Sequence, residues 1–200
     1  MVLYGASGHA KVIIDILEKR DIEISHIIDD NNEIVSLNNY SVQNNNIGIG
    51  EASLIISIGN NIIRKEISEK LKVHNFGQAI HPSLVIDKTS KILEGTVVMA
   101  NVVINSSVSI GKHCIINTNA VIEHDCQLEN FVHISPSATL CGNVIVGEGT
   151  HIGAGATVIP NIKIGKWCTI GAGSVILKDV PDYAVIYGNP GKVIKYNKIE

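Results

Sequence analysis

The sequence predicts a small Rossmann-like α/β domain followed by an all-β parallel β-helix, and three observations support this. From Ile86 to Ile176 an aliphatic residue stands at every sixth position, sixteen times in succession. A period of six fits neither an α-helix nor an ordinary strand, whose periods are about 3.6 and 2. Before this repeat, short apolar segments alternate with helical ones, as in a small parallel sheet. Aromatic residues make up only 4% of the chain, so Ile, Val and Leu must fill the core.

The other positions of the six-residue unit agree with short strands joined by corners. The residue four places after each aliphatic is usually small, and glycine often follows the aliphatic directly, where we expect a tight corner to favour it. Three units make one triangular coil of eighteen residues, so sixteen units make just over five coils with three inward columns. The small residues include Ser90, Thr96, Cys114, Ala120, Cys126, Ala138, Thr150, Ala156, Cys168 and Ser174, and the glycines are Gly111, Gly147, Gly153, Gly165 and Gly171.

We expect the α/β domain over residues 1–80 and the β-helix with a closing segment over residues 81–200. The α/β domain has two predicted helices and a polar, Asn-rich segment, Asn31 to Asn46, that we expect to be a loop. The predicted strands are Val2 to Tyr4, Ile24 to Ile28 and Leu54 to Ile58, and the predicted helices are Lys11 to Lys19 and Ile62 to Leu71.

Composition excludes several classes of partner. The formal net charge of −3 gives no electrostatic basis for binding nucleic acid or an anionic membrane surface. No apolar run approaches the roughly 20 residues of a membrane span, and Met1 leads directly into a strand, so we expect a cytoplasmic protein. The cysteines form no Cys-x-x-Cys pair and are expected to be small core residues; they are Cys114, Cys126, Cys141 and Cys168.

Three predicted strand ends of the α/β domain carry polar or glycine-containing turns. These are Gly5 to His9, Asp29-Asp30 and Gly59-Asn60. Ligands of open parallel sheets bind beyond the carboxyl ends of the strands, and a glycine turn that feeds a helix offers free N–H groups to phosphate. An acidic pair about twenty residues later suits the hydroxyl groups of a ribose or hydrogen-bond donors on a nucleotide base. The turn has two glycines, Gly5 and Gly8, rather than the three of a dinucleotide fingerprint, which argues against NAD.

These motifs together resemble one family. The six-residue repeat resembles that of left-handed β-helix acyltransferases, which implies a homotrimer with active sites between subunits. Tyr4 to His9, Ile28 to Asp30 and Ile58 to Asn61 with Arg64-Lys65 resemble bacterial nucleotide-linked amino-sugar N-acetyltransferases and the sialic acid O-acetyltransferases of similar plan. The resemblance spans nearly the whole chain. It implies that a UDP- or dTDP-sugar contacts Ser7, Gly8, His9, Asp29, Asp30 and Gly59.

His124 is the candidate catalytic base. It follows the inward Ile122 on a corner, from which its imidazole can project outward. A neutral imidazole with a pKa near its ordinary value of about 6.5 is a suitable base, and the carboxylate of Asp125 can hold its tautomer. Gly142 lies eighteen residues further on, directly above His124, and its backbone N–H is the candidate donor to the oxyanion.

The resemblance implies the same roles. Ile122 to Cys126 matches the family's catalytic segment, whose His accepts the proton and whose following acid, usually Glu, raises its basicity; Asp125 is one methylene shorter. His133 matches a residue that contacts acetyl-CoA, and it lies half a coil from His124, so the two converge only across a subunit interface. The backbones of Ala154 and Ala172 match the lining of the pantetheine channel, and Lys192 matches a partner of a CoA phosphate.

The expected function is an acetyl-CoA-dependent N-acetyltransferase acting on the 4-amino group of a UDP- or dTDP-linked 4-amino-4,6-dideoxy sugar. We expect direct transfer, because Cys126, the thiol nearest to His124, occupies an inward position. An O-acetyltransferase of sialic acid or another free sugar would share every catalytic residue. A non-catalytic or metal-dependent β-helix protein would use His133 and His151 as ligands, whereas the preferred interpretation needs no metal. We expect His26, His74 and His113 at the surface.

Overall fold

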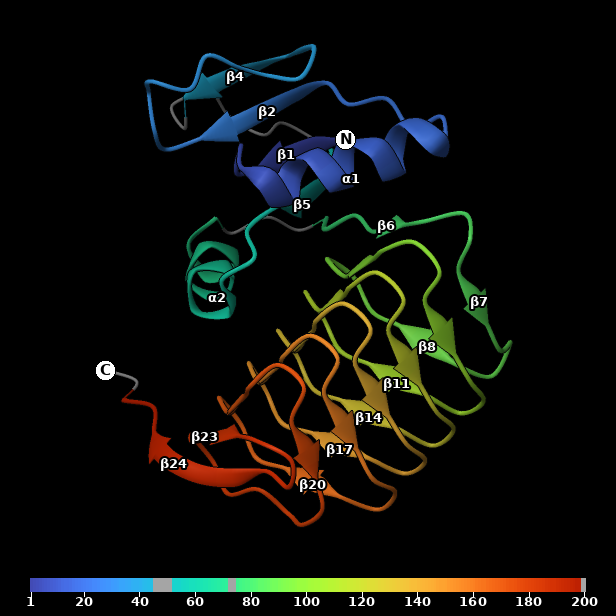
Figure 1. Ribbon diagram of the computed structural model, residues 1–200. Coiled ribbons are helices and arrows are strands. Elements are labelled where there is room, and N and C mark those ends of the chain that lie inside the picture. The colour runs from blue at the N-terminus through green and yellow to red at the C-terminus, as the bar shows by residue number, and fades with distance from the viewer. Residues whose placement is uncertain (45–51, 72–74, 199–200) are drawn as a thin grey trace.

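Residues 1–44, 52–71 and 75–198 are described by the computed structural model, in which an α/β part covers the first coils of a three-sided β-helix (Figure 1). Each predicted six-residue unit forms one two-residue strand, from β7 (Val85–Ile86) to β22 (Val175–Ile176). One further strand, β6 (Ala79–Ile80), precedes them. The strands between are β8 (Lys91–Ile92), β9 (Val97–Val98), β10 (Val103–Ile104), β11 (Ser109–Ile110), β12 (Ile115–Ile116), β13 (Val121–Ile122), β14 (Gln127–Leu128), β15 (His133–Ile134), β16 (Thr139–Leu140), β17 (Ile145–Val146), β18 (His151–Ile152), β19 (Thr157–Val158), β20 (Lys163–Ile164) and β21 (Thr169–Ile170).

Every third strand pairs in parallel, which produces the three faces of the β-helix. The sheets run β22-β19-β16-β13-β10-β7, β20-β17-β14-β11-β8 and β24-β23-β21-β18-β15-β12-β9-β6, where β23 (Ala184–Tyr187) and β24 (Lys192–Tyr196) extend the third sheet beyond the repeat. From β6 to β22 the paired residues are eighteen apart, as in Ile104 with Ile122 and His133 with His151. The inward aliphatic residues from Val98 to Ile176 are all buried and form one continuous core with the small residues between them. The predicted coil of three units is therefore confirmed.

The corners repeat a single backbone conformation. The third residue after each inward aliphatic has φ between 54° and 71°, at fourteen consecutive corners from Gly95 to Gly173. Only four of these residues are glycine. The others are Asn101, Ser107, His113, Asn119, Asp125, Phe131, Ser137, Asn143, Asn161 and Trp167. Asn and Asp tolerate this left-handed region better than other residues, because their short side chains hydrogen-bond locally.

The glycines directly after the aliphatics serve a different purpose from the predicted one. Gly111, Gly147 and Gly153 do not have a left-handed backbone; instead, a Cβ on any of them would come within 2.6–2.7 Å of backbone atoms of the next coil. A Cβ on Gly153, for example, would lie 2.6 Å from the Ala172 nitrogen. The close stacking of successive coils, rather than a special φ, therefore selects glycine here.

The α/β part is a sheet in the order β3-β4-β2-β1-β5, with β4, β2, β1 and β5 parallel. Its strands are β1 (Val2–Tyr4), β2 (His26–Asp29), β3 (Ser36–Leu37), β4 (Tyr40–Asn44) and β5 (Leu54–Ile56), and its helices are α1 (Gly8–Lys19) and α2 (Asn61–Lys70). The prediction of a loop from Asn31 to Asn46 is wrong over the described residues, which end at Asn44. The segment forms a hairpin whose second strand extends the sheet next to β2, although its side chains are half-buried or exposed.

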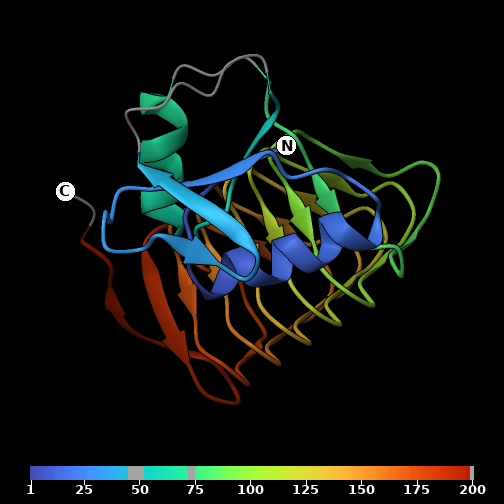
Figure 2. The ribbon, with the colours of Figure 1, turned by 90° about the horizontal axis from the view of Figure 1, so that it is seen from above.

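One apolar cluster joins the two parts of the molecule. Helix α1 packs between the sheet and the β-helix (Figure 2). Its buried residues, among them Ile13 and Leu17, belong to the same cluster as Val97, Met99 and Ile115 of the early coils. All of these side chains are at most 3% exposed, and the cluster also includes Leu3 and Ile55 of the sheet, so the interface is continuous with the core of the α/β part. The α/β part is therefore held in one orientation on the β-helix.

Helix α2 docks on a column of corner residues formed by Gly95, His113, Phe131, Gly149 and Trp167. The Phe76 ring meets the His113 ring edge-on, at 4.4 Å between centroids, and His113 stacks on Phe131 at 5.2 Å. Asn61 donates a hydrogen bond to the Gly149 carbonyl, and Lys65 pairs with Glu148 at 2.7 Å. Figure 1 shows α2 extending from the α/β part alongside the coils.

The surface position expected for His113 is wrong, because this column is covered by the α/β part. His113 is only 4% exposed. Burial, together with the positive charge of the nearby Arg64, lowers its pKa to about 4. His26 is half-buried in β2, and His74 lies outside the described residues.

Three of the four cysteines, Cys114, Cys126 and Cys168, are buried in the core as expected, and Cys141 is partly exposed; none forms a disulfide. Neither described helix has the length and apolar character needed to cross a bilayer.

Replacing Gly153 by Ala should destabilise the β-helix, because the added methyl would press on the backbone of the next coil. Overpacking of this kind costs about 1–3 kcal/mol of unfolding free energy. Gly155→Asn, in the same corner, is the matched control: Gly155 has φ +64° and open space around it, so Asn should change the stability by less than about 1 kcal/mol. Urea unfolding of both variants measures the difference, and equal stabilities would contradict the stacking argument.

His113→Asn should flatten the acid side of the stability profile. The unfolded chain binds a proton at His113 below its ordinary pKa of about 6.5, whereas the folded protein resists protonation down to about pH 4. The contribution of His113 to the free energy of unfolding is therefore lost as the pH falls from 6.5 to 4, by about 1 kcal/mol per pH unit. Asn tolerates the left-handed backbone and removes this slope. Phe76→Leu disturbs the same ring stack without removing the titrating group and should keep the native slope in pH-dependent urea unfolding.

Candidate active site

The turn between β1 and α1 is tied to the end of β2. Gly5 has φ +110°, and a Cβ there would lie 2.7 Å from the Ile58 side chain, so only glycine fits. Its N–H donates to the Ile28 carbonyl at 2.7 Å, and the Ala6 N–H donates to Asp29 Oδ2 at 2.6 Å. The turn therefore has a fixed shape before any ligand arrives.

Helix α1 begins at this turn with its first N–H groups uncapped. Ser7 occupies the N-cap position in extended conformation, but its side chain makes no capping hydrogen bond. Ser7 and Gly8 are exposed, and nothing lies within 4 Å of the position a Gly8 Cβ would take. A helix N-terminus with unpaired N–H groups and a partial positive charge attracts anions such as phosphate.

The six predicted substrate contacts gather at one edge of the sheet. Strands β2, β1 and β5 are neighbours, and the residues lie at or just beyond their carboxyl ends. They are Ser7, Gly8, His9, Asp29, Asp30 and Gly59. The two aspartates already have protein partners: Asp29 Oδ1 accepts from the Asn31 N–H at 2.8 Å, and Asp30 Oδ1 accepts from the Tyr4 hydroxyl at 2.8 Å. Asp29 thus holds the turn in place.

His9 lies at the base of this edge as a neutral imidazole. Burial, and secondarily the charge of Arg64, lowers its pKa to about 4. Its Nε2 is buried and has no hydrogen-bond partner among the described residues.

A cavity of about 490 Å³ opens between the start of α2 and the face of the β-helix that carries β15, β18 and β21. Its walls come from the β5–α2 turn, from three successive coils and from the returning C-terminal segment. They are Gly59, Asn60, Asn61, Ile62, His133, Gly149, His151, Trp167, Cys168, Thr169, Asn197 and Lys198. The cavity thus lies beside the sheet edge described above, because Gly59 belongs to both.

Two stacked neutral imidazoles form part of this wall. The His133 and His151 rings lie parallel, 4.6 Å apart. Asn117 Nδ2 lies 3.3 Å from His133 Nε2; since an amide NH₂ can only donate, this ring nitrogen accepts and the proton sits on Nδ1. Burial, and then the charges of His151, Arg64 and His9, lowers the pKa of His133 to about 3. The pair therefore offers uncharged polar groups to a ligand.

Trp167 and Asn197 complete the cavity, and the sequence analysis predicted neither as a site residue. The Trp167 indole lies over Gly149, where a Cβ would be 2.3 Å from the ring, and Lys65 Nζ lies 5.4 Å from the ring centroid. Asn197 donates to the Trp167 carbonyl and to Thr169 Oγ1. The eighteen-residue spacing of Gly149 and Trp167 was the available signal for one contact, but no periodicity covers Asn197.

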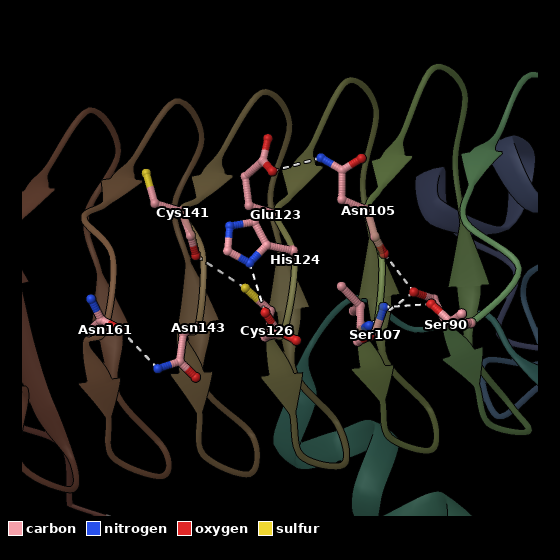
Figure 3. Close-up of polar contacts among 12 residues, drawn as sticks. Ser90, Asn105, Ser107, Glu123, His124, Cys126, Cys141, Asn143 and Asn161 are labelled. Carbon is pink, nitrogen blue, oxygen red and sulfur yellow. Dashed lines mark hydrogen bonds and ion pairs between the residues drawn. The ribbon is translucent and has the colours of Figure 1, made fainter.

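His124 lies on the corner between β13 and β14 (Figure 3), and no residue of that corner lines the cavity. Its Nδ1 is 2.8 Å from Asp125 Oδ2, and the side chains are 59% and 58% exposed. The carboxylate accepts, so Nδ1 carries the proton and Nε2 keeps its lone pair. Asp125 reaches the ring because its own φ is +60°, the corner conformation, rather than that of a strand.

Gly142 lies directly over the basic nitrogen, as its spacing predicts. A Cβ on Gly142 would be 2.7 Å from His124 Nε2 and 2.6 Å from Cε1. The Gly142 N–H has no acceptor among the described residues. An imidazole nitrogen and an unused N–H donor thus lie side by side on the outer surface of one corner.

Neighbouring side chains at this corner have other partners. Asn105, one coil earlier, donates to Glu123 at 2.7 Å, and Figure 3 shows the Glu123 carboxylate turned toward it. Cys126 points inward, donates to the Cys141 carbonyl and is fully buried, which raises the pKa of its thiol to about 11. A buried, protonated thiol is a poor nucleophile.

The remaining predicted residues lie further along the coils. Ala154 and Ala172 are exposed at equivalent corner positions one coil apart, connected through the Gly173 N–H to Ala154 carbonyl bond. Lys192 is exposed at the start of β24 (Lys192–Tyr196), which pairs with β23 (Ala184–Tyr187). The structure therefore brings together His124, Asp125 and Gly142, but it places His133 on another face of the same β-helix. Within the described chain no group of three or more His, Cys, Asp or Glu side chains could hold a metal ion.

Comparison with known families matches both parts of the chain. Residues 1–71 match the PglD N-terminal domain, and residues 89–124, 125–160 and 143–178 match the bacterial transferase hexapeptide (six repeats). Over 110 residues the chain is 40% identical to UDP-N-acetylbacillosamine N-acetyltransferase of Bacillus subtilis (strain 168). This match covers 50% of the chain and 51% of that protein, so it spans about half the length of the curated relative.

Solved structures match over nearly the full length. PerB from Caulobacter crescentus in complex with CoA and GDP-perosamine has 36% identity and a TM-score of 0.91, covering 97% of this chain and 96% of that one. The acetyltransferase domain of PglB from Neisseria gonorrhoeae FA1090, in complex with acetyl coenzyme A, has 33% identity and a TM-score of 0.89, covering 96% and 98%. The fold is the left-handed parallel β-helix that the repeat predicts. The chain belongs to the hexapeptide-repeat transferases that carry a PglD N-terminal domain, the family of these sugar N-acetyltransferases.

Proposed function

We propose that the protein transfers the acetyl group of acetyl-CoA to the amino group of a nucleotide-linked sugar. The observation that carries this proposal is the His124 corner, where Nε2 keeps its lone pair and lies beneath Gly142. The relatives support it, since PerB is described with CoA and GDP-perosamine and the Bacillus subtilis relative is named an N-acetyltransferase. Those names favour an amino group over a hydroxyl group as the acceptor.

The α/β part, residues 1–80, would hold the nucleotide as a Rossmann-like domain. The uncapped start of α1 at Ser7 and Gly8 would receive the diphosphate, and the cavity beyond Gly59 has room for the sugar. We propose a 4-amino-4,6-dideoxy sugar linked to UDP or dTDP. His9, Asp29 and Asp30 border the same edge, with Asp29 acting through the turn that it holds.

In the proposed reaction the sugar amine attacks the thioester carbonyl carbon of acetyl-CoA. The carbonyl π electrons move to oxygen, where the Gly142 N–H donates to the oxyanion. His124 Nε2 takes the proton that the attacking nitrogen loses, and Asp125 stabilises the resulting imidazolium. Collapse of the tetrahedral intermediate breaks the C–S bond, and the imidazolium returns its proton to the departing thiolate of CoA. No covalent acyl-enzyme forms, in keeping with the buried Cys126 thiol.

The exposed His124 corner would be completed by a neighbouring subunit of a homotrimer. His124 and His133 lie on different sides of one β-helix, so a single subunit does not bring them together. We propose that residues 81–200 associate three-fold and that acetyl-CoA lies in the cleft between two β-helices. Its contacts would be His133, the backbones of Ala154 and Ala172, and Lys192 for a phosphate.

His124→Ala should lower turnover about 10²–10⁴-fold, because general-base catalysis contributes this much. The exposed side chain makes few native contacts, so melting temperature and sedimentation should stay native. Ser106→Ala, at the same corner position one coil earlier, is the matched control and should remain active. Near-normal turnover of His124→Ala in a CoA-release assay would remove the base assignment.

Nucleotides that the folded protein binds must raise its melting temperature. We expect UDP or dTDP to raise it more than GDP or CMP at equal concentration, and acetyl-CoA to raise it independently of either. Thermal-shift measurements with each ligand alone and in pairs test this. A response to GDP alone would move the substrate toward that of the Caulobacter relative, and no response to any nucleotide would exclude a nucleotide-linked sugar.

A further inference from the structure

Arg64 is the most completely buried charged residue among those described, at 1% exposure. It lies in the first turns of α2, and all five of its N–H groups donate hydrogen bonds. Nε donates to the His113 carbonyl at 2.8 Å, and Nη2 donates to the Phe131 carbonyl and to Asn61 Oδ1. Nη1 donates to the carbonyls of Ile58 and Gly59, at 2.9 and 3.2 Å. One side chain thus joins the β5–α2 turn to two corners of the β-helix.

None of these acceptors is charged. No carboxylate of the described chain lies within the 4.0 Å of an ion pair with Arg64. A buried charge without a counter-ion is costly, and an apolar residue or a neutral hydrogen-bonding one would fill the same space at lower cost. Burial lowers the pKa of Arg64 only to about 10, so it stays protonated at neutral pH. The interface between α2 and the β-helix therefore contains a buried positive charge at neutral pH.

The charge lies between the two halves of the proposed substrate site. Arg64 contacts the Gly59 carbonyl and the Asn61 side chain, and both residues line the cavity. Its field also reaches the start of α1, because it lowers the pKa of His9 after burial has done so. The Arg64 charge helps to lower the pKa of three nearby imidazoles, which are neutral and so do not compensate it. They are His9, His133 and His151.

We infer that Arg64 is a positioning residue for the anionic part of the substrate. It holds the Gly59–Asn61 turn against the β-helix and supplies a positive charge that the ligand's diphosphate neutralises. The inference rests on the proposed function, which makes the substrate a nucleoside diphosphate derivative. Arg64 does not touch the ligand, because its five donors are already used; it acts through the shape of the turn and through its field.

The test compares the charge with the hydrogen bonds. Arg64→Gln removes the charge, whereas Arg64→Lys keeps it but can make at most three of the five bonds. Phe76→Leu weakens the same docking interface without altering charge. UDP, dTDP and GDP are titrated calorimetrically into the wild type and each variant, with acetyl-CoA as the second ligand.

We expect Arg64→Gln to weaken binding of the nucleoside diphosphate at least about tenfold, while Arg64→Lys and Phe76→Leu stay within about threefold of the wild type. Acetyl-CoA affinity should change little in any variant. Native diphosphate affinity in Arg64→Gln would overturn the inference, as would equal losses in all three variants. If the wild type binds no nucleoside diphosphate, the proposed function fails as well; if it binds but ignores Arg64, only this inference fails.

A second pair serves if Arg64→Gln does not fold. Asn61→Asp places a carboxylate on Arg64 Nη2 and keeps that acceptor, whereas Asn61→Ala removes the acceptor without adding charge. Both lose the bond to the Gly149 carbonyl. Because Asn61→Asp keeps the bond from Arg64 Nη2 and Asn61→Ala does not, weaker diphosphate binding by Asn61→Asp reports the added negative charge and not a lost hydrogen bond. Asn61→Asp should bind the diphosphate about tenfold more weakly than Asn61→Ala, with equal acetyl-CoA affinity. Equal diphosphate affinities in this pair would count against the inference.

Discussion

The whole arrangement depends on the eighteen-residue coil. Because successive coils pair strand on strand in parallel, residues eighteen apart in sequence are neighbours in space. That single constraint places Gly142 over His124, His151 over His133 and Trp167 over Gly149. None of these contacts needs a long loop or a special tertiary interaction. A site built this way is as rigid as the core beneath it, which suits chemistry that requires a base and a donor at fixed separation.

The α/β part adds a cavity with an irregular wall, which the regular coils of the β-helix do not form by themselves. It is attached in two ways, by the apolar cluster around α1 and by the polar contacts of α2 with the corner column. The first is non-directional and supplies burial, whereas the second fixes the β5–α2 turn in one register against the coils. Arg64 contributes to both, because its hydrogen bonds join three segments that are distant in sequence. The acceptors are the carbonyl groups of Ile58, His113 and Phe131.

The sequence was sufficient wherever one repeated rule governed a position. The three columns of inward aliphatic residues predicted all sixteen strands from β7 to β22, and the same period predicted the Gly142–His124 contact. It failed where contacts come from outside the repeat. His113 was expected to be exposed, since nothing local indicates that Phe76 will cover it. Strand β4 was not predicted, because a strand with polar, half-exposed side chains shows no alternation of apolar residues. The contacts of Arg64 were not predicted either, because its acceptors are backbone carbonyl groups, which carry no sequence signal.

The uniform left-handed corner also limits how such a chain can change in length. At fourteen consecutive corners, from Gly95 to Gly173, the third residue after the inward aliphatic has positive φ, and the strand that follows pairs with the strand one coil earlier. Inserting or deleting a single residue within a coil would move the inward side chains of all later coils to the outer surface. It would also separate the residues that stack eighteen apart across the change. Within the β-helix, insertions are therefore tolerable only as bulges that leave and re-enter at one corner, or as whole coils of eighteen residues, which keep every later residue on its face. At its end the β-helix can grow by a single six-residue unit, since the sixteen units from β7 to β22 are one more than five coils.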